Sequence, residues 1–357
     1  MASSTTRGPI SMALVGMSGV MQDAHIPNLL DLGFEREPLF RIAGVCDRDA
    51  GLVDSVGAAL RAAVFHSMET VCASPEVEAV LIATPPDTHL ALFEQAVCAG
   101  KHVFIEKPLT FSIREAWRMA ALARDAATVV RIGYMFRHHR DAILTKKRID
   151  EGAIGEPRTC VNLVVPPSTP VWPRRFPTPP KQRGGWNEAD PENEDQLGLD
   201  MWSDNSVHYL NLMQWWFGPV ESVYATWRRE GPMMMLRYAS GVLATHVFSP
   251  IRLSERRDFT IIGTEGAIDV RLHYPMQRNT IGHYAETRRG DLARKEMEGD
   301  HSDMYRDELV AFGKAIVAGE TGDPERSFEM GARDLMTVKA AHRSSKSGRE
   351  ERVGAAP

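Results

Sequence analysis

Residues 12–27 read MALVGMSGVMQDAHIP, and this stretch decides the fold of the first part of the chain. An apolar run over residues 12–15 enters the turn sequence GMSG, and a helical pattern follows. Strand, glycine turn and helix in this order form the phosphate-binding turn of dinucleotide-binding domains, where three glycines allow a tight turn, close approach of a pyrophosphate and close helix packing. Gly16 takes the first position, whereas Ser18 and Met21 stand at the other two. The stretch therefore predicts a dinucleotide turn with two substitutions.

The sequence around this turn alternates strand and helix patterns. Strands are predicted at residues 11–15, 41–46, 79–83 and 102–105. Ser112 begins the capping box SIRE and predicts the start of a helix. Because such alternation favours parallel βαβ units, we expect residues 1–132 to form an α/β Rossmann domain with a doubly wound parallel sheet.

Beyond about residue 150 the pattern changes to short strands separated by turns. The candidates are residues 157–165, 220–228, 233–238, 242–248, 259–262 and 267–272. They predict antiparallel hairpins, in which the run from Met233 to Met235 fills the core. We expect residues 133–357 to form an α+β domain for substrate binding and oligomerisation, with a mostly antiparallel open sheet. A helix over 302–318 is expected to pack back on the first domain, and the polar tail 344–357 to fray.

Composition excludes several classes of partner. The 357 residues carry a net charge of −5, which gives no reason to expect nucleic acid or an anionic membrane surface. The N-terminal MASSTTRGPISM has no apolar segment of a signal peptide, and no stretch is long enough to span a bilayer, so we expect a cytoplasmic protein. The four cysteines are widely spaced and predict reduced, buried thiols and no metal site.

An irregular, proline-rich tract over residues 166–203 interrupts the second half. So long a loop inside a domain is typical of a lid or binding loop, or else of a disordered segment. Its basic side chains suit a phosphate and its acidic side chains an amine, although a solvated surface explains them equally well. The basic residues are Arg174, Arg175, Lys181 and Arg183, and the acidic residues are Glu188, Asp190, Glu192, Glu194 and Asp195.

An acidic residue stands at the end of the second predicted strand, in GVCDRD. In dinucleotide-binding domains a carboxylate at this position accepts hydrogen bonds from the ribose hydroxyls, and here it is Asp47. Its charge would repel a 2′-phosphate, whereas the neighbouring Arg48 would tolerate one. We expect NAD as the cofactor, with NADP as the alternative.

Residues 80–110, VLIATPPDTHLALFEQAVCAGKHVFIEKPLT, resemble the Gfo/Idh/MocA family of nicotinamide-dependent oxidoreductases. The resemblance rests on TPP followed by a histidine, and on EKP at the end of the fourth predicted strand. It continues through residues 133–140, 149–157 and 203–225, and weakly through 305–316. Most of the chain outside the 166–202 tract and the termini is covered.

The resemblance implies three catalytic residues. Oxidation of a secondary alcohol needs a base for the hydroxyl proton and a positive group that polarises the oxygen. In the family, the lysine of EKP contacts the reacting oxygen, and a histidine in a D-x-x-x-H helix accepts the proton. The matching residues here are Lys107 and His208, with Asp204 as the partner of the histidine. Residues four apart lie on one helix face, so Asp204 and His208 can point into one pocket.

The same resemblance implies binding residues. Predicted cofactor-binding residues are Gly16, Ser18, Gly19, Val20, Asp47, Arg48, Thr84, Pro85, His89, Glu106 and Lys107. Predicted substrate-binding residues are Tyr134, Arg137, Trp186, Asn211 and Tyr305. The chain departs from the family at Ser206, where glycine is common, and at Asn211, where aspartate is common, which leaves the substrate open.

We expect an NAD(P)-dependent dehydrogenase or reductase that acts on a secondary hydroxyl or ketone of a sugar, nucleotide sugar or (amino)cyclitol. The homo-oligomer expected from the open sheet would be a dimer or tetramer. Two alternatives stay open. One is a lyase or hydrolase that keeps NAD bound and uses transient oxidation, and the other is a non-catalytic NAD(P)-binding sensor.

Overall fold

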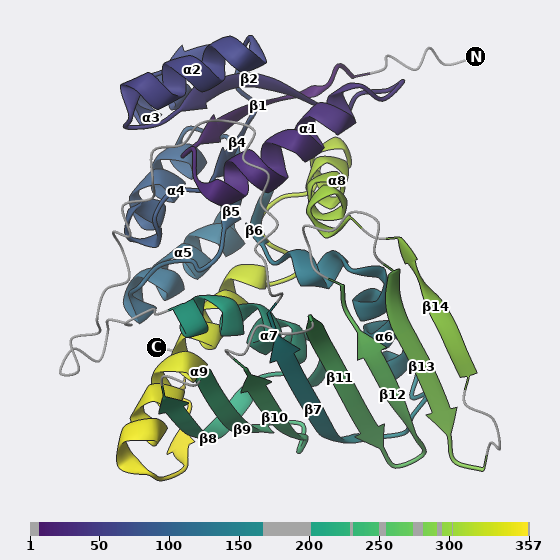
Figure 1. The fold of residues 1–357 in the computed structure, drawn as a ribbon. Coiled ribbons are helices and arrows are strands. Elements are labelled where there is room, and N and C mark those ends of the chain that lie inside the picture. Colours follow the sequence, from purple (N-terminus) through teal and green to yellow (C-terminus); the bar gives the residue numbers. More distant parts are fainter. Residues whose placement is uncertain are drawn as a thin grey trace.

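The computed structural model describes residues 7–166, 201–228, 231–249, 255–273, 281–290, 295–301 and 303–355. Within these residues the chain forms two sheets, one above the other in Figure 1, with helices on and between them. Trp186 and nearly all of the proline-rich tract lie outside the described residues, so their predicted roles stay predictions.

The first sheet has six parallel strands in the order β3-β2-β1-β4-β5-β6. Its strands are β1 (Ile10–Val15), β2 (Phe40–Cys46), β3 (Ala63–Phe65), β4 (Ala79–Ile82), β5 (His102–Glu106) and β6 (Val130–Gly133). Its helices are α1 (Ile26–Gly33), α2 (Ala50–Leu60), α3 (Met68–Ala73), α4 (His89–Cys98) and α5 (Ile113–Asp125). The expected Rossmann fold is confirmed, and the strand order reverses between β1 and β4, where such sheets open a crevice at their carboxyl ends.

The second sheet has nine strands in the order β14-β13-β12-β11-β7-β10-β9-β8-β15. The strands are β7 (Pro157–Val165), β8 (Val220–Arg228), β9 (Gly231–Tyr238), β10 (Leu243–Phe248), β11 (Arg256–Gly263), β12 (Gly266–Arg271), β13 (Ile281–Arg288), β14 (Lys295–His301) and β15 (Glu351–Arg352). Neighbouring strands are antiparallel except β7 and β10, which are parallel, and this confirms the expected mostly antiparallel sheet.

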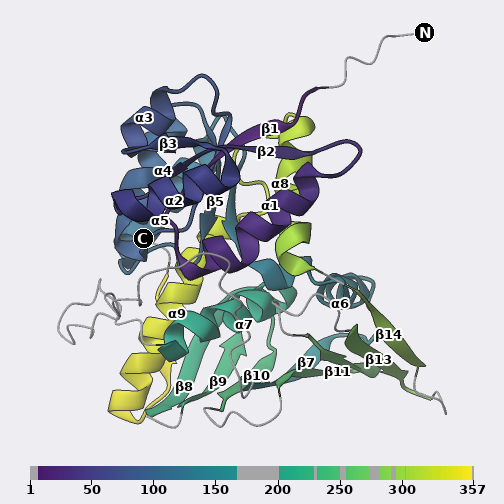
Figure 2. The same ribbon diagram turned by 45° about the horizontal axis from the view of Figure 1, so that its top comes forward.

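Helices cover one face of this second sheet. They are α6 (Arg140–Asp150), α7 (Met201–Phe217) and α9 (Ser327–Ser347). Figure 2 shows them between the sheet and the first domain, while the opposite face carries no helix of the described chain. None of the described helices is long and apolar enough to cross a membrane.

Helix α8 (Met304–Val317) returns to the first domain, as Figure 1 shows beside α1. It matches the helix predicted over 302–318, and Asp303 caps its first turn. Leu309 and Phe312 are buried in the same apolar cluster as Phe40 of β2 and Phe104 of β5. One face of the first sheet is therefore completed by residues from the end of the chain.

The tail over residues 344–357 was expected to fray, and this prediction is wrong for residues 344–355, which the structure describes. Ser344 and Ser345 lie in the last turn of helix α9, and their hydroxyls accept hydrogen bonds from the main-chain N–H groups of Ala225 at 2.9 Å and Trp227 at 2.7 Å. Strand β15 then pairs with β8. The serines look like a polar tail in the sequence, but they satisfy donors at the edge of the sheet.

The methionine run was expected to be core filling, and this is correct for Met234 alone. Met233 and Met235 are each 56% exposed, because successive side chains of β9 alternate between the helix-covered face and the open face.

The cysteines also differ from the expectation that all four are buried. Cys46 and Cys160 are buried free thiols, whereas Cys98 at the end of α4 is an exposed one.

Candidate active site

A cavity of about 400 Å³ lies where the carboxyl ends of the parallel strands meet the second half of the chain. The first domain contributes the segments that follow β1, β4 and β5. The second half contributes the short helix η3 (Met135–His138), the start of α7, and residues of β11 and α8. Nine predicted site residues line the cavity: Ser18, Gly19, Val20, Thr84, Glu106, Lys107, Asp204, His208 and Tyr305.

The turn after β1 is built around Gly16. Its φ of +88° lies in the region that favours glycine, and a Cβ here would lie 2.6 Å from Cγ2 of Thr84 and 2.8 Å from the carbonyl oxygen of Ala83. Met21, at the position of the third glycine, is fully buried and begins a π-helical turn, η1 (Met21–His25), that leads into α1. The hydroxyl of Ser18 accepts a hydrogen bond from the N–H of Met21 at 3.4 Å.

Replacing Gly16 with alanine should destabilise the protein by at least about 2 kcal/mol, because the strained φ and the contacts with Thr84 and Ala83 add together. Thermal unfolding and cofactor titration would measure the effect. Gly51→Ala is the matched control, since its Cβ would meet no atom closer than 3.6 Å on helix α2. Equal midpoints for Gly16→Ala and the wild type would contradict the steric requirement.

Asp47 lies at the end of β2 beside this turn. One carboxylate oxygen accepts a hydrogen bond from the N–H of Met17 at 2.6 Å, and the other accepts one from the N–H of Asp49 at 2.9 Å. Asp47 therefore joins the ends of β1 and β2, where a ribose would lie in this fold. The neighbouring Arg48 is exposed.

His89 is fully buried beneath the TPP segment and outside the cavity lining. Its ring nitrogens lie 2.9 Å from the carbonyl oxygen of Thr84 and 3.0 Å from that of Leu109. Burial lowers the pKa of this histidine. The ring thus joins the segment after β4, which includes Pro85, to the segment that follows EKP.

Lys107 and Asp204 join the two halves of the chain at the cavity. The ammonium of Lys107 donates to Oδ1 of Asp204 at 2.8 Å and to its carbonyl oxygen at 3.1 Å. Both side chains are partly exposed to solvent. The sequence predicted Asp204 as the partner of His208, whereas the hydrogen bond in this structure runs to Lys107.

His208 lies one turn further along α7. Its ring meets the ring of Phe136 edge to face, with centroids 5.6 Å apart, and its Nδ1 has no partner in the part of the chain described. Burial and the charges of Lys107 and Arg257 hold the pKa of His208 well below its ordinary value. The imidazole is therefore neutral at pH 7 and able to accept a proton.

Three predicted substrate residues, Tyr134, Arg137 and Asn211, do not line the cavity. Arg137 donates to Asn211 at 2.7 Å, and Asn211 donates to Asp334 of α9 at 2.6 Å. Burial raises the pKa of Asp334 to about 7. Tyr134 is buried beside the same network, and its ring meets the ring of His208 edge to face. These residues hold α7 against η3 and α9, and so support His208.

Eight further residues line the cavity outside the predicted set. They are Ala83, Pro86, Pro108, Met135, Phe136, Asn205, Tyr209 and Arg257. All but Arg257 are immediate neighbours of predicted site residues. Arg257 had no such signal, because β11 reaches the cavity only through the order of the second sheet. It is buried, and it donates to the hydroxyl of Tyr209 at 3.1 Å.

The residues at the carboxyl ends of β1, β2, β4 and β5 fit a nicotinamide dinucleotide. Gly16 leaves no room for a side chain between its main chain and the segment after β4, so the turn is held close to the crevice. The cavity then continues from Ser18 and Gly19 to Lys107 and His208.

Two sequence relatives are named as enzymes that act on a sugar derivative and on a cyclitol. The 1,5-anhydro-D-fructose reductase of Ensifer adhaerens is 26% identical over 301 residues, which is 80% of this chain and 83% of that protein. The scyllo-inositol 2-dehydrogenase (NAD(+)) of Bacillus subtilis is 36% identical over 87 residues, about a quarter of each chain (24% and 25%).

Solved structures share the fold over nearly the whole chain. Levoglucosan dehydrogenase, solved with NADH and levoglucosan, has a TM-score of 0.77 at 20% identity and covers 97% of this chain and 100% of its own. A 3-ketoreductase from Actinomadura kijaniata, solved with NADP and TDP-benzene, has a TM-score of 0.73 at 21% identity, with 94% and 98% covered.

Two family models match consecutive parts of the chain. The Gfo/Idh/MocA oxidoreductase model with an NAD-binding Rossmann fold matches residues 10–134. The model of the C-terminal alpha/beta domain of the same family matches residues 146–354. The chain therefore belongs to the Gfo/Idh/MocA family of NAD-binding oxidoreductases.

Proposed function

We propose that this protein is a dehydrogenase or reductase that interconverts a secondary hydroxyl and a ketone on a sugar, nucleotide sugar or (amino)cyclitol. The observation that carries the proposal is the meeting of Lys107, Asp204 and His208 in one cavity with the glycine turn. The names of the relatives support this class of substrate.

In the proposed reaction, Lys107 donates a hydrogen bond to the reacting oxygen and stabilises the negative charge that develops there. His208 accepts the hydroxyl proton during oxidation and returns it during reduction, and its neutral form at pH 7 suits the first role. Asp204 holds the ammonium of Lys107 at the mouth of the reaction site. A bound nicotinamide supplies the hydride acceptor or donor.

A spectroscopic experiment tests the proposal directly. The purified protein is saturated with NAD or NADP, and the absorbance of the reduced nicotinamide is followed with a panel of sugars, inositols and nucleotide sugars. Sustained, substrate-dependent reduction supports the proposal. A protein that binds cofactor and is inert toward the whole panel would instead be a sensor, and a bound cofactor that is not consumed while a glycoside is cleaved would identify a lyase or hydrolase.

We expect NAD to be preferred over NADP by at least about tenfold in kcat/KM, because the carboxylate of Asp47 repels a 2′-phosphate. Initial rates with both oxidised cofactors at one substrate concentration series give the ratio. Arg48→Ala should leave the NAD rate unchanged and lower the rate with NADP. A clear NADP advantage in the wild type would show that Arg48 dominates over Asp47.

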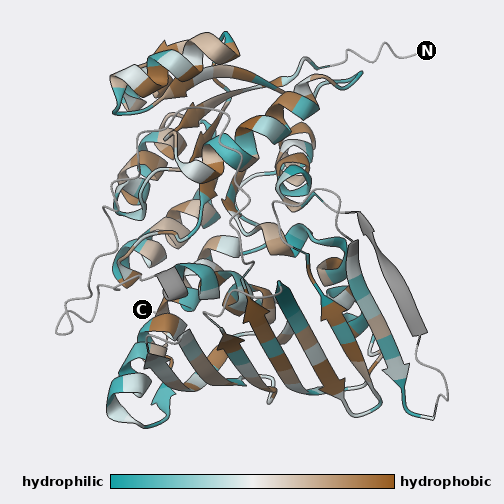
Figure 3. Ribbon diagram, viewed as in Figure 1, coloured by the Kyte–Doolittle hydropathy of each residue, from teal (hydrophilic) through white to brown (hydrophobic). Residues whose placement is uncertain are grey.

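A homo-oligomer is proposed from the open face of the second sheet, within the proposed domain 133–357. Exposed apolar side chains lie on this face: Tyr224 of β8, Met233 and Met235 of β9, Leu243 of β10, Val161 of β7 and Ile262 of β11. In the strand register Tyr224 pairs with Met235, Met235 pairs with Thr245, and Thr245 pairs with Val161. These four residues therefore form one row across the sheet. Figure 3 shows apolar residues along the middle strands of this sheet. Exposed apolar side chains gathered on one sheet face are typical of a surface that a second copy covers.

Replacing Met235 with glutamate should convert a dimer or tetramer into smaller species, because a carboxylate would be buried in the interface without a partner. Light scattering after size-exclusion chromatography gives the mass. Phe34→Glu is the control, since Phe34 is 85% exposed on the first domain. A Met235→Glu variant with the wild-type mass would place the interface elsewhere.

A further inference from the structure

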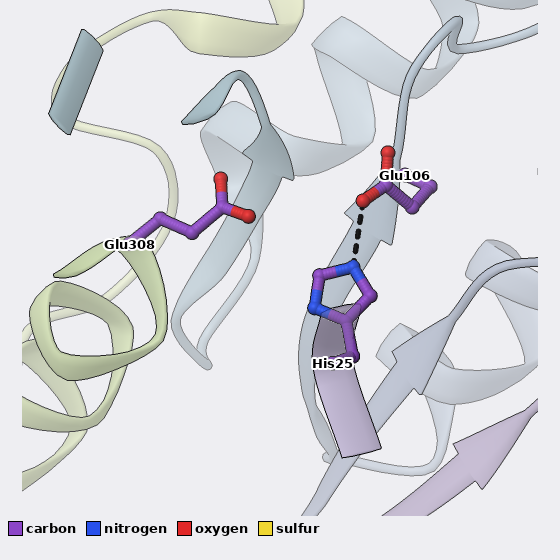
Figure 4. A group of neighbouring side chains, drawn as sticks. All are labelled: His25, Glu106 and Glu308. Carbon is purple, nitrogen blue, oxygen red and sulfur yellow. Dashed lines mark hydrogen bonds and ion pairs between the residues drawn. The ribbon is translucent and has the colours of Figure 1, made fainter. Parts of the chain in front are cut away.

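Three side chains that could bind a metal ion converge beneath the cavity. His25 ends the η1 turn, Glu106 ends β5, and Glu308 lies on α8. All three are buried, and one ligand atom from each lies within 4.8 Å of the others. Figure 4 shows the carboxylate of Glu308 directed from its helix toward the His25 and Glu106 pair.

The hydrogen bonding of this cluster is incomplete. His25 Nε2 lies 2.7 Å from Oε1 of Glu106. Among the described residues, neither carboxylate oxygen of Glu308 has a hydrogen-bond partner, and neither does Nδ1 of His25. A buried carboxylate without a partner carries a large desolvation cost, so native proteins rarely leave one unsatisfied.

The local charge is also unbalanced. Glu106 and Glu308 place two carboxylates in one buried cluster with a single histidine. Glu308 also lines a smaller cavity of about 80 Å³, together with Arg131 and Arg137. Arg137 is bonded to Asn211, and Arg131 is paired with Glu320 at 2.9 Å. A proton or a cation is therefore needed to offset the repulsion between the two carboxylates of Glu106 and Glu308.

We propose that His25, Glu106 and Glu308 bind a divalent transition metal ion of the zinc type. One imidazole nitrogen with two carboxylate oxygens is a common ligand set for Zn²⁺, and three protein ligands leave room for water. Two carboxylates and a neutral imidazole balance the charge of the ion. One ligand atom from each residue lies within 4.8 Å of the others. Nε2 of His25 and Oε1 of Glu106 are only 2.7 Å apart, so these two atoms would have to separate slightly to bind one ion with bonds of about 2.0–2.2 Å.

A proton on Glu308 is the competing explanation, and it fits less well. It removes one charge, but Nδ1 of His25 and an oxygen of Glu308 still lack partners within the described structure. A divalent ion would take an oxygen of Glu308 and one nitrogen of His25 as ligands, and it would neutralise both carboxylates together. No sequence pattern indicates such a site, because its three ligands come from distant segments that only the packing of α8 brings together.

Of the three ligands only Glu106 lines the cavity of the proposed reaction site, so the metal ion would lie at the edge of that site. The other oxygen of Glu106 accepts a hydrogen bond from the N–H of Lys107 at 3.1 Å. An ion that fixes Glu106 thus fixes the end of β5 from which Lys107 projects, and it ties α8 to the first domain. We assign it a positioning role and no part in hydride transfer.

Metal content and unfolding temperature test the site without any activity assay. Chelator-treated full-length protein is dialysed against Zn²⁺, desalted and analysed by elemental mass spectrometry. We expect one zinc per chain and a rise in the unfolding midpoint, because a ligand that binds only the folded state stabilises it. Glu308→Gln and His25→Asn should lose both effects. The matched controls Glu37→Gln and His66→Asn change exposed residues and should keep both.

Cobalt substitution gives a second measurement on the wild-type protein, which does not depend on how the variants fold. Bound Co²⁺ should show visible ligand-field bands without a sulfur charge-transfer band, since the proposed ligands include no cysteine. A sulfur band would place the metal on a thiol and overturn the assignment. Zinc that stays bound to the Glu308→Gln variant would also overturn the assignment, and so would a wild-type protein that retains no zinc after desalting. In the second case, a proton shared by Glu106 and Glu308 would be the explanation of the cluster.

Discussion

Replacing Lys107 with methionine should lower kcat about 10²- to 10³-fold while the affinity for the oxidised cofactor changes little. Methionine keeps most of the aliphatic length but removes the ammonium that we place against the reacting oxygen. Because that charge matters most when the oxygen becomes negative, the loss should fall on kcat more than on KM. Steady-state kinetics and cofactor titration by fluorescence measure the two quantities.

The control for this variant is Lys146→Met. Lys146 lies on α6, pairs with Asp150 at 2.6 Å and is not part of the cavity lining. It should keep the wild-type kcat. If Lys107→Met also kept it, Lys107 would have no role in the reaction. If it lost cofactor binding instead, the role of Lys107 would be to hold the dinucleotide.

Replacing His208 with asparagine should lower the rate of oxidation about 10²- to 10⁴-fold, the usual range for loss of a proton acceptor. The pH profile gives a second readout. The pKa of His208 is held below 6.5, so the neutral acceptor is present at pH 7, and the wild-type rate should fall only as pH drops through that lowered value. The His208→Asn variant should lack this falling limb.

Lys107 offers a check on the cause of the lowered pKa. The charge of Lys107 is one of the contributors after burial, so Lys107→Met should raise the pKa of His208 toward its ordinary value. Histidine titration by NMR reads this out without turnover, with His66→Asn to help assign signals. An unchanged pKa would mean that burial and the charge of Arg257 lower the pKa of His208 without a contribution from Lys107. A wild-type falling limb above pH 7 would mean that another group is the acceptor.

The residues of the candidate site were easiest to predict where a reactive or phosphate-binding motif follows the carboxyl end of a predicted strand. Lys107 and the glycine turn lie at the carboxyl ends of predicted strands, and parallel pairing brings such ends together whatever the rest of the chain does. His208 and Asp204 share a helix face by their spacing. Short strands such as β3 and β6 were missed because three or four residues carry too little alternation to recognise.

The remaining differences between the predicted and the observed site have two causes. Some hydrogen-bond partners lie on a helix that was not predicted, and one residue reaches the cavity through the pairing of distant strands. Arg137 and Asn211 look like substrate ligands because they are polar and close to the motifs. Asp334, which binds Asn211 in the interior, lies on α9, a helix that the sequence did not indicate. Arg257 reaches the cavity through the pairing of β11 with β7, which spans about a hundred residues of sequence and leaves no local pattern.

The return of α8 to the first domain has a consequence for how the protein is made. Phe312 stacks on Phe40 with ring centroids 6.5 Å apart and meets Phe104 at 5.7 Å, so these aromatic residues lack part of their cover until α8 has been synthesised. Domains near the N-terminus usually fold first on the ribosome. Here the first 132 residues would emerge with an apolar face open and wait for nearly the whole chain, which makes chaperone binding to the nascent protein an expected stage of its biosynthesis.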